Sequence, residues 1–138
     1  QRGSYLARHQ RRTLVTLDVG KLLRFAEVIE DFASDNVAYL ELRTTPRAVA
    51  ATQLTKRGHI ETVVAAIRDC EKRGVRITVR LLLSIDRRHS LAEAKEALAL
   101  AKEFRDAKLG GYVVGLDFSG NPTVNNFAVR RHSALAVL

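Results

Sequence analysis

Hydrophobic and polar positions alternate along this chain with two different periods. In three stretches the apolar residues recur every three or four positions, which predicts amphipathic helices. These stretches are residues 21–36, 55–74 and 90–110. Each is followed by a run of β-branched and apolar residues that predicts a strand. The predicted strands begin at Val37, Val75 and Tyr112, which lie 38 and 37 residues apart.

The alternation of strands with single helices is typical of consecutive right-handed βαβ units. Two architectures fit this period: an open doubly wound sheet, and a (β/α)8 TIM barrel, which usually needs about 250 residues. No glycine-rich loop follows any predicted strand, whereas all three strands end in polar residues. An open sheet of three strands would also leave long edges unpaired. These features favour an α/β fold that is a partial TIM barrel, with about three consecutive βα units and a preceding helix.

The first predicted strand carries charge on one face. In V-A-Y-L-E-L-R-T-T-P-R, residues 37–47, Glu41 and Arg43 fall on the same side, while the positions that alternate with them are apolar. Parallel strands are normally apolar on both faces. Two interpretations remain open: Glu41 and Arg43 form an interior ion pair that braces the fold, or they contact a substrate directly.

Polar groups also occur at the carboxyl end of each predicted strand, where α/β proteins place ligand contacts. These residues are Thr44, Thr45, Pro46 and Arg47 after the first strand, Asp86 after the second, and Asp117, Ser119 and Gly120 at the third. A guanidinium beside hydroxyls suits a phosphate or a carboxylate, and a glycine lets a ligand approach the backbone closely. Ordinary turn chemistry also accounts for the hydroxyls, so both interpretations stay open.

Composition supports a folded domain, because 46% of the 138 residues are hydrophobic and only two are proline. The net charge of +8 comes mainly from residues 1–17 and 123–138, which carry arginines and no acidic residue. Nucleic acid is therefore not an expected partner, since nucleic-acid binders usually cluster their basic residues on one folded face. We expect a basic, disordered segment at 1–17, a partial barrel at 18–124 and a tail outside the barrel at 125–138.

The single cysteine, Cys70, lies at helical spacing from Val63 and Ile67, which predicts a small buried hydrophobe and a reducing, cytoplasmic compartment. No run approaches the ~18 apolar residues that cross a bilayer, so a membrane is not an expected partner. Neither Cys70 nor Ser119 lies in a recognisable nucleophile motif. The histidines form no metal-binding motif along the sequence, and they are His9, His59, His89 and His132.

The chain contains the blocks Y-L-E-L-R-T-T-P-R at 39–47, I-D-R-R at 85–88 and G-L-D-F-S-G-N-P at 115–122. In order and spacing these blocks resemble the adenosine deaminase-like proteins, the N(6)-methyl-AMP deaminases of the adenosine deaminase superfamily. The resemblance covers roughly residues 22–124. It implies a zinc-dependent (β/α)8 barrel that hydrolyses a 6-amino or 6-alkylamino purine nucleotide to its inosine form.

The resemblance also implies roles for individual residues. Thr44, Thr45, Pro46 and Arg47 look like the nucleotide-binding loop that takes the phosphate. Asp86 looks like a further substrate contact, and Gly120 looks like the backbone donor to the purine. The residue pattern, rather than the resemblance, gives Glu41, Arg43 and Asp117 a structural role that supports these contacts. The three predicted strands would correspond to the second, third and fourth strands of the family's barrel.

The sequence departs from that family at the metal site. The family takes zinc from a His-x-His on the first barrel strand, a His in a His-x-x-Glu block and a later Asp, and that Glu shuttles the proton. None of the His motifs occurs in this sequence. We therefore expect a fragment of a hydrolase of nucleotide metabolism, with substrate-binding loops and a purine nucleotide as partner, but inactive alone. The alternative is a non-catalytic interaction or regulatory product that pairs its strand edges with a partner. The oligomeric state stays open.

Overall fold

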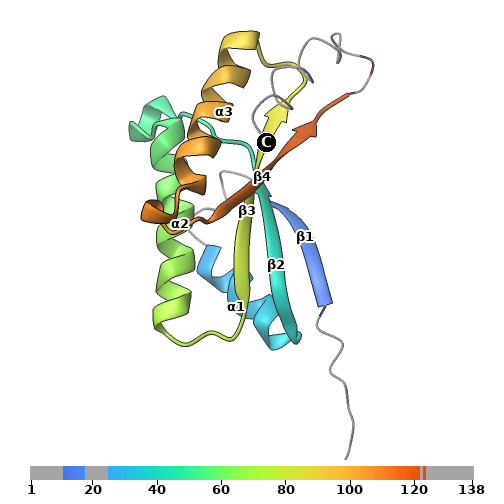
Figure 1. The fold of residues 1–138 in the computed structure, drawn as a ribbon, viewed down its shortest axis with the longest axis vertical. Coiled ribbons are helices and arrows are strands. Elements are labelled where there is room, and N and C mark those ends of the chain that lie inside the picture. Colours follow the sequence, from blue (N-terminus) through green and yellow to red (C-terminus); the bar gives the residue numbers. More distant parts are fainter. Residues whose placement is uncertain (1–10, 18–24, 122, 124–138) are drawn as a thin grey trace, which may run out of the picture.

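The computed structural model describes residues 11–17, 25–121 and 123 of the 138-residue chain. In this part of the chain, strands and helices alternate as β1 (Arg11–Leu17), α1 (Phe25–Ser34), β2 (Val37–Thr44), α2 (Lys56–Lys72), β3 (Thr78–Asp86), α3 (Leu91–Arg105) and β4 (Val113–Ser119). Two short 3₁₀ helices, η2 (Ala50–Thr52) and η3 (Ala107–Leu109), precede α2 and β4. The strands form one parallel sheet in the order β1-β2-β3-β4, with the helices along one side (Figure 1). The predicted α/β class is confirmed.

The helices α2 and α3 begin at the capping signals in their sequence. Thr55 is the N-cap of α2, where its hydroxyl oxygen accepts a hydrogen bond from the backbone N–H of Gly58 at 2.9 Å. Ser90 and Glu93 form a complete capping box at the start of α3. Gly74 follows α2 with a φ of +76°, which is the left-handed conformation expected after a helix. Local signals therefore set where α2 and α3 begin and where α2 ends.

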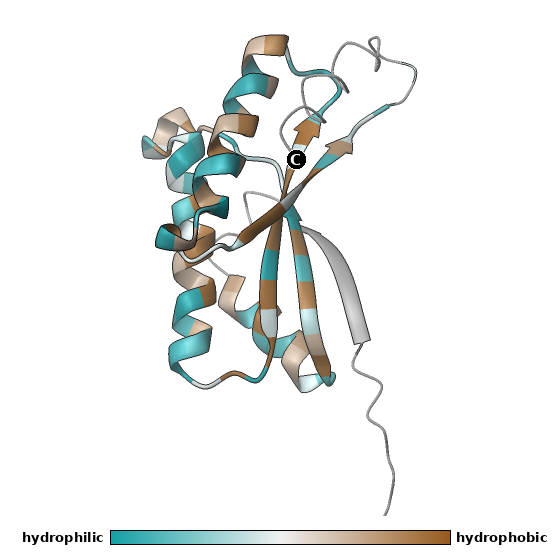
Figure 2. Ribbon diagram, in the orientation of Figure 1, coloured by the Kyte–Doolittle hydropathy of each residue, from teal (hydrophilic) through white to brown (hydrophobic). Residues whose placement is uncertain are grey.

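The core lies between the helices and one face of the sheet. Its fully buried residues include Leu40 and Leu42 on β2, Leu81 and Leu83 on β3, and Ile60, Val63 and Ile67 on α2. Figure 2 shows hydrophobic segments along β2, β3 and β4, and hydrophobic patches between hydrophilic ones on the helices. Cys70 is 2% exposed within this core, so the prediction of a small buried hydrophobe is confirmed.

Strand β1 differs from the expectation of a disordered segment at 1–17 in the part that the structure describes, residues 11–17. Arg11–Leu17 pairs in parallel with β2, with Leu14 opposite Glu41 and Leu17 opposite Thr44. The sequence T-L-V-T-L within it has the β-branched residues of a strand. The described sheet therefore has four strands rather than the three predicted. Residues 1–10 and 124–138 lie outside the described residues.

The bounds of the predicted elements also shift. β3 begins at Thr78 rather than Val75, because the backbone N–H of Val75 donates to the carbonyl of Cys70 at 3.0 Å and so closes the end of α2. β3 extends to Asp86, which makes Asp86 the last residue of the strand. Of the helix predicted for 21–36, residues 21–24 lie outside the described part. No helix among the described residues has both the length and the apolar character to span a membrane.

Candidate functional site

The carboxyl ends of β2, β3 and β4 lie along one edge of the sheet, because the strands are parallel and consecutive. Asp86, the last residue of β3, is paired with Ser119, the last residue of β4. Thr44, the last residue of β2, is paired with Leu83. Since a strand rises about 3.3 Å per residue, β2 ends roughly 10 Å before β3 does. Along the strand direction, the segment that follows Thr44 therefore leaves the sheet before the position of Asp86 is reached.

Asp86 and Gly120 are in direct contact at the top of β3 and β4. Gly120 has a φ of +98°, and a Cβ at this position would lie 2.9 Å from Oδ1 of Asp86. The backbone N–H of Arg87 donates to the carbonyl of Ser119 at 2.9 Å and ties the two strand ends together. Glycine is thus required here both by its conformation and by the close approach of the carboxylate. The structure brings together two of the residues predicted from sequence as substrate contacts.

The carboxylate of Asp86 is bound by Arg88. Oδ1 accepts from the backbone N–H of Arg88 at 2.8 Å and from its Nε at 3.0 Å, and Oδ2 accepts from its Nη2 at 2.7 Å. The hydrogen bonds from the Arg88 side chain and backbone hold the pKa of Asp86 well below its usual range. Asp86 is therefore an acceptor at neutral pH. A ligand hydroxyl that binds Asp86 has to share it with Arg88, whose side chain is 71% exposed.

Asp117 connects three strands on the sheet face opposite the core. Its Oδ2 accepts from Nη1 of Arg43 on β2 at 3.1 Å and from the hydroxyl of Ser84 on β3 at 3.2 Å. Ser84 also contacts the hydroxyl of Ser119 at 2.8 Å. One sequence interpretation paired Glu41 with Arg43, but in the structure Arg43 forms an ion pair with Asp117. Glu41 instead accepts from the phenol hydroxyl of its neighbour on the strand, Tyr39, at 2.8 Å.

The residues of the predicted phosphate loop differ in exposure. Thr44 is 2% exposed, because it lies on the same face of β2 as the buried leucines and points toward α2. Pro46 is also buried, Thr45 is half-buried and Arg47 is exposed. Thr45 and Arg47 are therefore the loop side chains that a ligand can reach, while Thr44 and Pro46 anchor the loop in the protein.

A residue not singled out from the sequence, His59, is the partner of Thr44. His59 lies in the first turns of α2 and is 0% exposed, and its Nε2 is 2.9 Å from Oγ1 of Thr44. Burial, and secondarily the positive charge of Arg47, lowers the pKa of His59, so that the ring is neutral at physiological pH. The signal in the sequence was its position: His59 precedes Val63 and Ile67 by four and eight residues, on the apolar face of the helix.

Zinc does not fit the part of the chain that the structure describes. Across residues 11–17, 25–121 and 123, no three His, Cys, Asp or Glu side chains are grouped so that they could hold a metal ion. The acidic residues at the strand ends are instead engaged by arginines, as in the pairs of Asp86 with Arg88 and Asp117 with Arg43. The described side chains at the strand ends are therefore suited to bind anions and hydroxyls.

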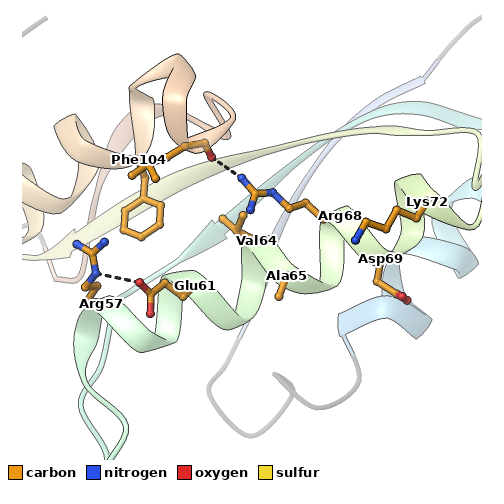
Figure 3. A pocket seen from close by; sticks show the side chains of 9 residues that line it. Arg57, Glu61, Val64, Ala65, Arg68, Asp69, Lys72 and Phe104 are labelled. Carbon is orange, nitrogen blue, oxygen red and sulfur yellow. Dashed lines mark hydrogen bonds and ion pairs between the residues drawn. The ribbon is translucent and has the colours of Figure 1, made fainter.

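A groove of about 410 Å³ lies elsewhere, on the helix layer (Figure 3). It is bounded by α2, by Phe104 at the end of α3 and by Leu109. Its arginines are already engaged: Arg57 pairs with Glu61 at 2.9 Å, and Arg68 donates to the carbonyl of Leu109 at 2.9 Å. None of the residues predicted from sequence as substrate contacts lines this groove. The strand ends therefore remain the candidate site.

Comparison with known proteins gives consistent matches. The adenosine deaminase family model matches residues 4–134, a wider range than the 18–124 expected from sequence. The N6-methyl-AMP deaminase of Danio rerio is 48% identical over 113 residues, which is 82% of this chain and 32% of the relative. The N6-methyl-AMP deaminase of Homo sapiens is 45% identical over 98 residues, 71% of this chain and 27% of the relative. The chain thus spans about a third of the length of these relatives.

Solved structures are also similar. The apo structure of the N6-methyl-AMP deaminase from Arabidopsis thaliana is 39% identical, with a TM-score of 0.73 over 87% of this chain and 36% of that one. Arabidopsis structures in complex with IMP and with GMP match with the same TM-score of 0.73. An amidohydrolase from Burkholderia ambifaria with bound Zn has a TM-score of 0.63 and 25% identity, over 83% of this chain and 32% of that one.

Proposed function

Since this chain belongs to the adenosine deaminase family, whose members are hydrolytic deaminases, we propose that it forms the nucleotide-binding part of a deaminase for purine nucleotides of the N(6)-methyl-AMP type. Its four strands and three helices match part of the family's TIM barrel. The observation that carries the proposal is the meeting of the strand ends, where Asp86 lies against Gly120. The complexes of the Arabidopsis relative with IMP and GMP support a nucleotide as the ligand.

The phosphate is taken by the segment after β2. Arg47 is exposed and presents a planar guanidinium that can donate two hydrogen bonds to one phosphate. The hydroxyl of Thr45 adds a donor from the same loop. Thr44 and Pro46, both buried, fix the path of the backbone that carries them. The loop therefore offers charge and hydrogen bonds from Arg47 and Thr45, on an anchored backbone.

The nucleoside part lies toward β3 and β4. Asp86 accepts a hydroxyl of the ligand in exchange for part of its contact with Arg88, and the backbone N–H of Gly120 donates to the purine. Gly120 itself has no side chain, and the space that a Cβ would take is filled by the carboxylate of Asp86, so the ligand groups that bind Asp86 and Gly120 lie close together. The bonds from Arg43 and Ser84 to Asp117 hold β2, β3 and β4 in register beneath the ligand.

A chain of this sequence binds the nucleotide without deaminating it. The described residues include no set of three metal-ligating side chains, and the sequence lacks the His-x-His and His-x-x-Glu motifs that the family resemblance associates with zinc and proton transfer. The test is to incubate the purified chain with zinc and N(6)-methyl-AMP and to measure the products of hydrolysis, IMP and methylamine. We expect no turnover above a metal-free blank, and turnover above that blank contradicts the claim of inactivity.

Binding is tested by titrating IMP into the ¹⁵N-labelled chain and following the backbone amides by NMR. We expect saturable shifts at Thr45, Arg47 and Gly120. Arg47→Ala should weaken binding about tenfold, because a hydrogen-bonded charge contributes roughly 1.5 kcal/mol or more. Arg76→Ala is the matched control, since Arg76 is exposed and precedes β3 at the opposite end of the strand. Equal loss of affinity in both variants would mean that only the net charge matters.

A second candidate function is the capture of a protein partner at the edge of the sheet. β4 lies at one edge of the described sheet, and Val114 on it is 42% exposed. Leu98 and Ala101 of α3 border the same surface beside Leu116. Size-exclusion chromatography with light scattering distinguishes the candidates. Self-association or co-purification with a partner that Val114→Lys abolishes supports the interaction product, whereas a monodisperse monomer argues against it.

A further inference from the structure

We propose that His59 is a positioning residue for phosphate recognition, which acts through its hydrogen bond to Thr44 to hold Thr45 and Arg47 in place. The inference deepens the proposed function and rests on it for the identity of the ligand. His59 does not touch the nucleotide, because its side chain is fully buried. It acts on the backbone of the loop that does.

The hydrogen bond between His59 and Thr44 closes the base of the loop. Thr44 is the last residue of β2, and His59 lies one turn after Thr55, the N-cap of α2. The loop between them is braced at its far end, where the backbones of Val49 and Leu54 exchange hydrogen bonds of 2.8 and 3.1 Å. Thr45 and Arg47 therefore lie in a short segment with one brace on each side, and the imidazole supplies the brace next to β2.

Core packing alone does not explain a histidine at this position. The Nδ1 atom of His59 is buried and has no hydrogen-bond partner in the described structure. A buried polar atom without a partner lowers stability, and an apolar residue of the same shape avoids that cost. What the imidazole provides, and an apolar side chain does not, is the 2.9 Å bond to the hydroxyl of Thr44. The geometry thus favours a role in fixing Thr44.

The neutral state of His59 suits this role. A charged imidazolium would place a second positive charge near Arg47 and repel the guanidinium that takes the phosphate. Burial and the charge of Arg47 both lower the pKa of His59. The neutral imidazole can therefore bind Thr44 beneath the 44–47 segment without competing with Arg47 for the anion.

The test is a double-mutant cycle on nucleotide affinity. His59→Phe and Thr44→Val should each weaken IMP binding about fivefold, and the double variant should be no weaker than either single one, because both remove the same bond. Binding of inosine, which lacks the phosphate, should be unchanged. His59→Gln, whose amide can still reach a hydroxyl, should recover part of the affinity. Cys70→Ala is the control for core damage, since Cys70 is buried on α2 far along the helix from the loop.

A second measurement keeps the inference testable without any ligand. Heteronuclear NOE values for the amides of Thr45 and Arg47 should fall in His59→Phe and stay unchanged in Cys70→Ala. If the native chain does not bind IMP, the proposed function fails while these values still test the positioning role. The inference is overturned if His59→Phe keeps the loop as rigid as in the native chain. If the native chain binds IMP, two further results overturn the inference: an equal loss of IMP and inosine affinity in His59→Phe, or additive losses of IMP affinity when His59→Phe is combined with Thr44→Val.

Discussion

Replacing Gly120 by alanine tests how tightly β3 and β4 meet at the candidate site. The new Cβ would lie 2.9 Å from Oδ1 of Asp86 and 3.3 Å from the backbone nitrogen of Arg87. Because the backbone of Arg87 is tied to Ser119, the carboxylate of Asp86 is the group that has to move. Moving it disturbs the hydrogen bonds that Asp86 accepts from Arg88.

The expected cost has two parts, and a second glycine separates them. The left-handed backbone costs an alanine about 1–2 kcal/mol at either position. Gly74 provides the matched control, because its φ is +76° but nothing lies within 4 Å of the Cβ position. The displacement of Asp86 adds about 1 kcal/mol in Gly120→Ala, a small value because Arg88 is largely exposed. Gly120→Ala should therefore lower the free energy of unfolding by about 2–3 kcal/mol, and Gly74→Ala by about 1–2 kcal/mol.

Urea unfolding followed by circular dichroism measures both variants, and the IMP titration is repeated on each. Gly120→Ala should also weaken IMP binding, whereas Gly74→Ala should leave it unchanged, since only Gly120 is placed beside the nucleotide. Equal losses of stability in the two variants, together with native IMP affinity in Gly120→Ala, would refute the close contact between Asp86 and Gly120.

Three further predictions follow from the same contacts. Asp117→Asn removes the charge that pairs with Arg43 and should lower the free energy of unfolding, measured in urea, by about 1 kcal/mol, a modest value because the pair is partly exposed. An unchanged urea midpoint would contradict this prediction. Thr55→Ala removes the N-cap of α2 and should cost about 1 kcal/mol by the same assay, and Thr62→Ala, on the exposed side of α2, serves as its comparison. The pKa of His59 in the folded state lies below its usual 6.5, so the stability that the neutral ring contributes is present above pH 6.5 and is lost as the pH falls through the folded-state pKa. In His59→Phe, the free energy of unfolding should change less over this range of pH.

Local signals in the sequence were sufficient for the alternation of helix and strand from α1 to β4, although not for β1. The N-cap at Thr55 and the capping box at Ser90 are short patterns with a single structural meaning, and both form as expected. The sequence also indicated that Asp86 and Gly120 lie at the same edge of the sheet, because both follow the carboxyl ends of consecutive parallel strands, but their direct contact depends on the register that pairs Asp86 with Ser119. The chain order determines the common edge of the sheet and leaves the register open.

Features that depend on register or on tertiary packing were not predictable in the same way. Arg43 pairs with Asp117 because the pairing of β3 with β4 brings Asp117 beside Ser84, and that register is not encoded in either strand alone. Strand β1 was missed because its two arginines were interpreted as part of a basic, disordered segment, although the residues after them are β-branched and apolar. His59 was judged only as a metal ligand, although its helical position beside Val63 indicated burial.

The orientation of Thr44 was available from the period of the strand. It alternates with Arg43 and shares a face with Leu42, so its side chain points into the core rather than toward a ligand. The family resemblance placed it with Thr45 and Arg47 in the phosphate loop. In our account Thr44 holds that loop through His59, while Thr45 and Arg47 reach the ligand.

The most direct test of the central claim is a crystal structure of this chain with IMP. We predict that the phosphate lies within hydrogen-bonding distance of Thr45 and the guanidinium of Arg47, with the purine beside the backbone N–H of Gly120. Thr44 should keep its bond to His59 in that complex. IMP bound instead in the groove between Arg57 and Phe104, or with its phosphate away from Arg47, would contradict the account.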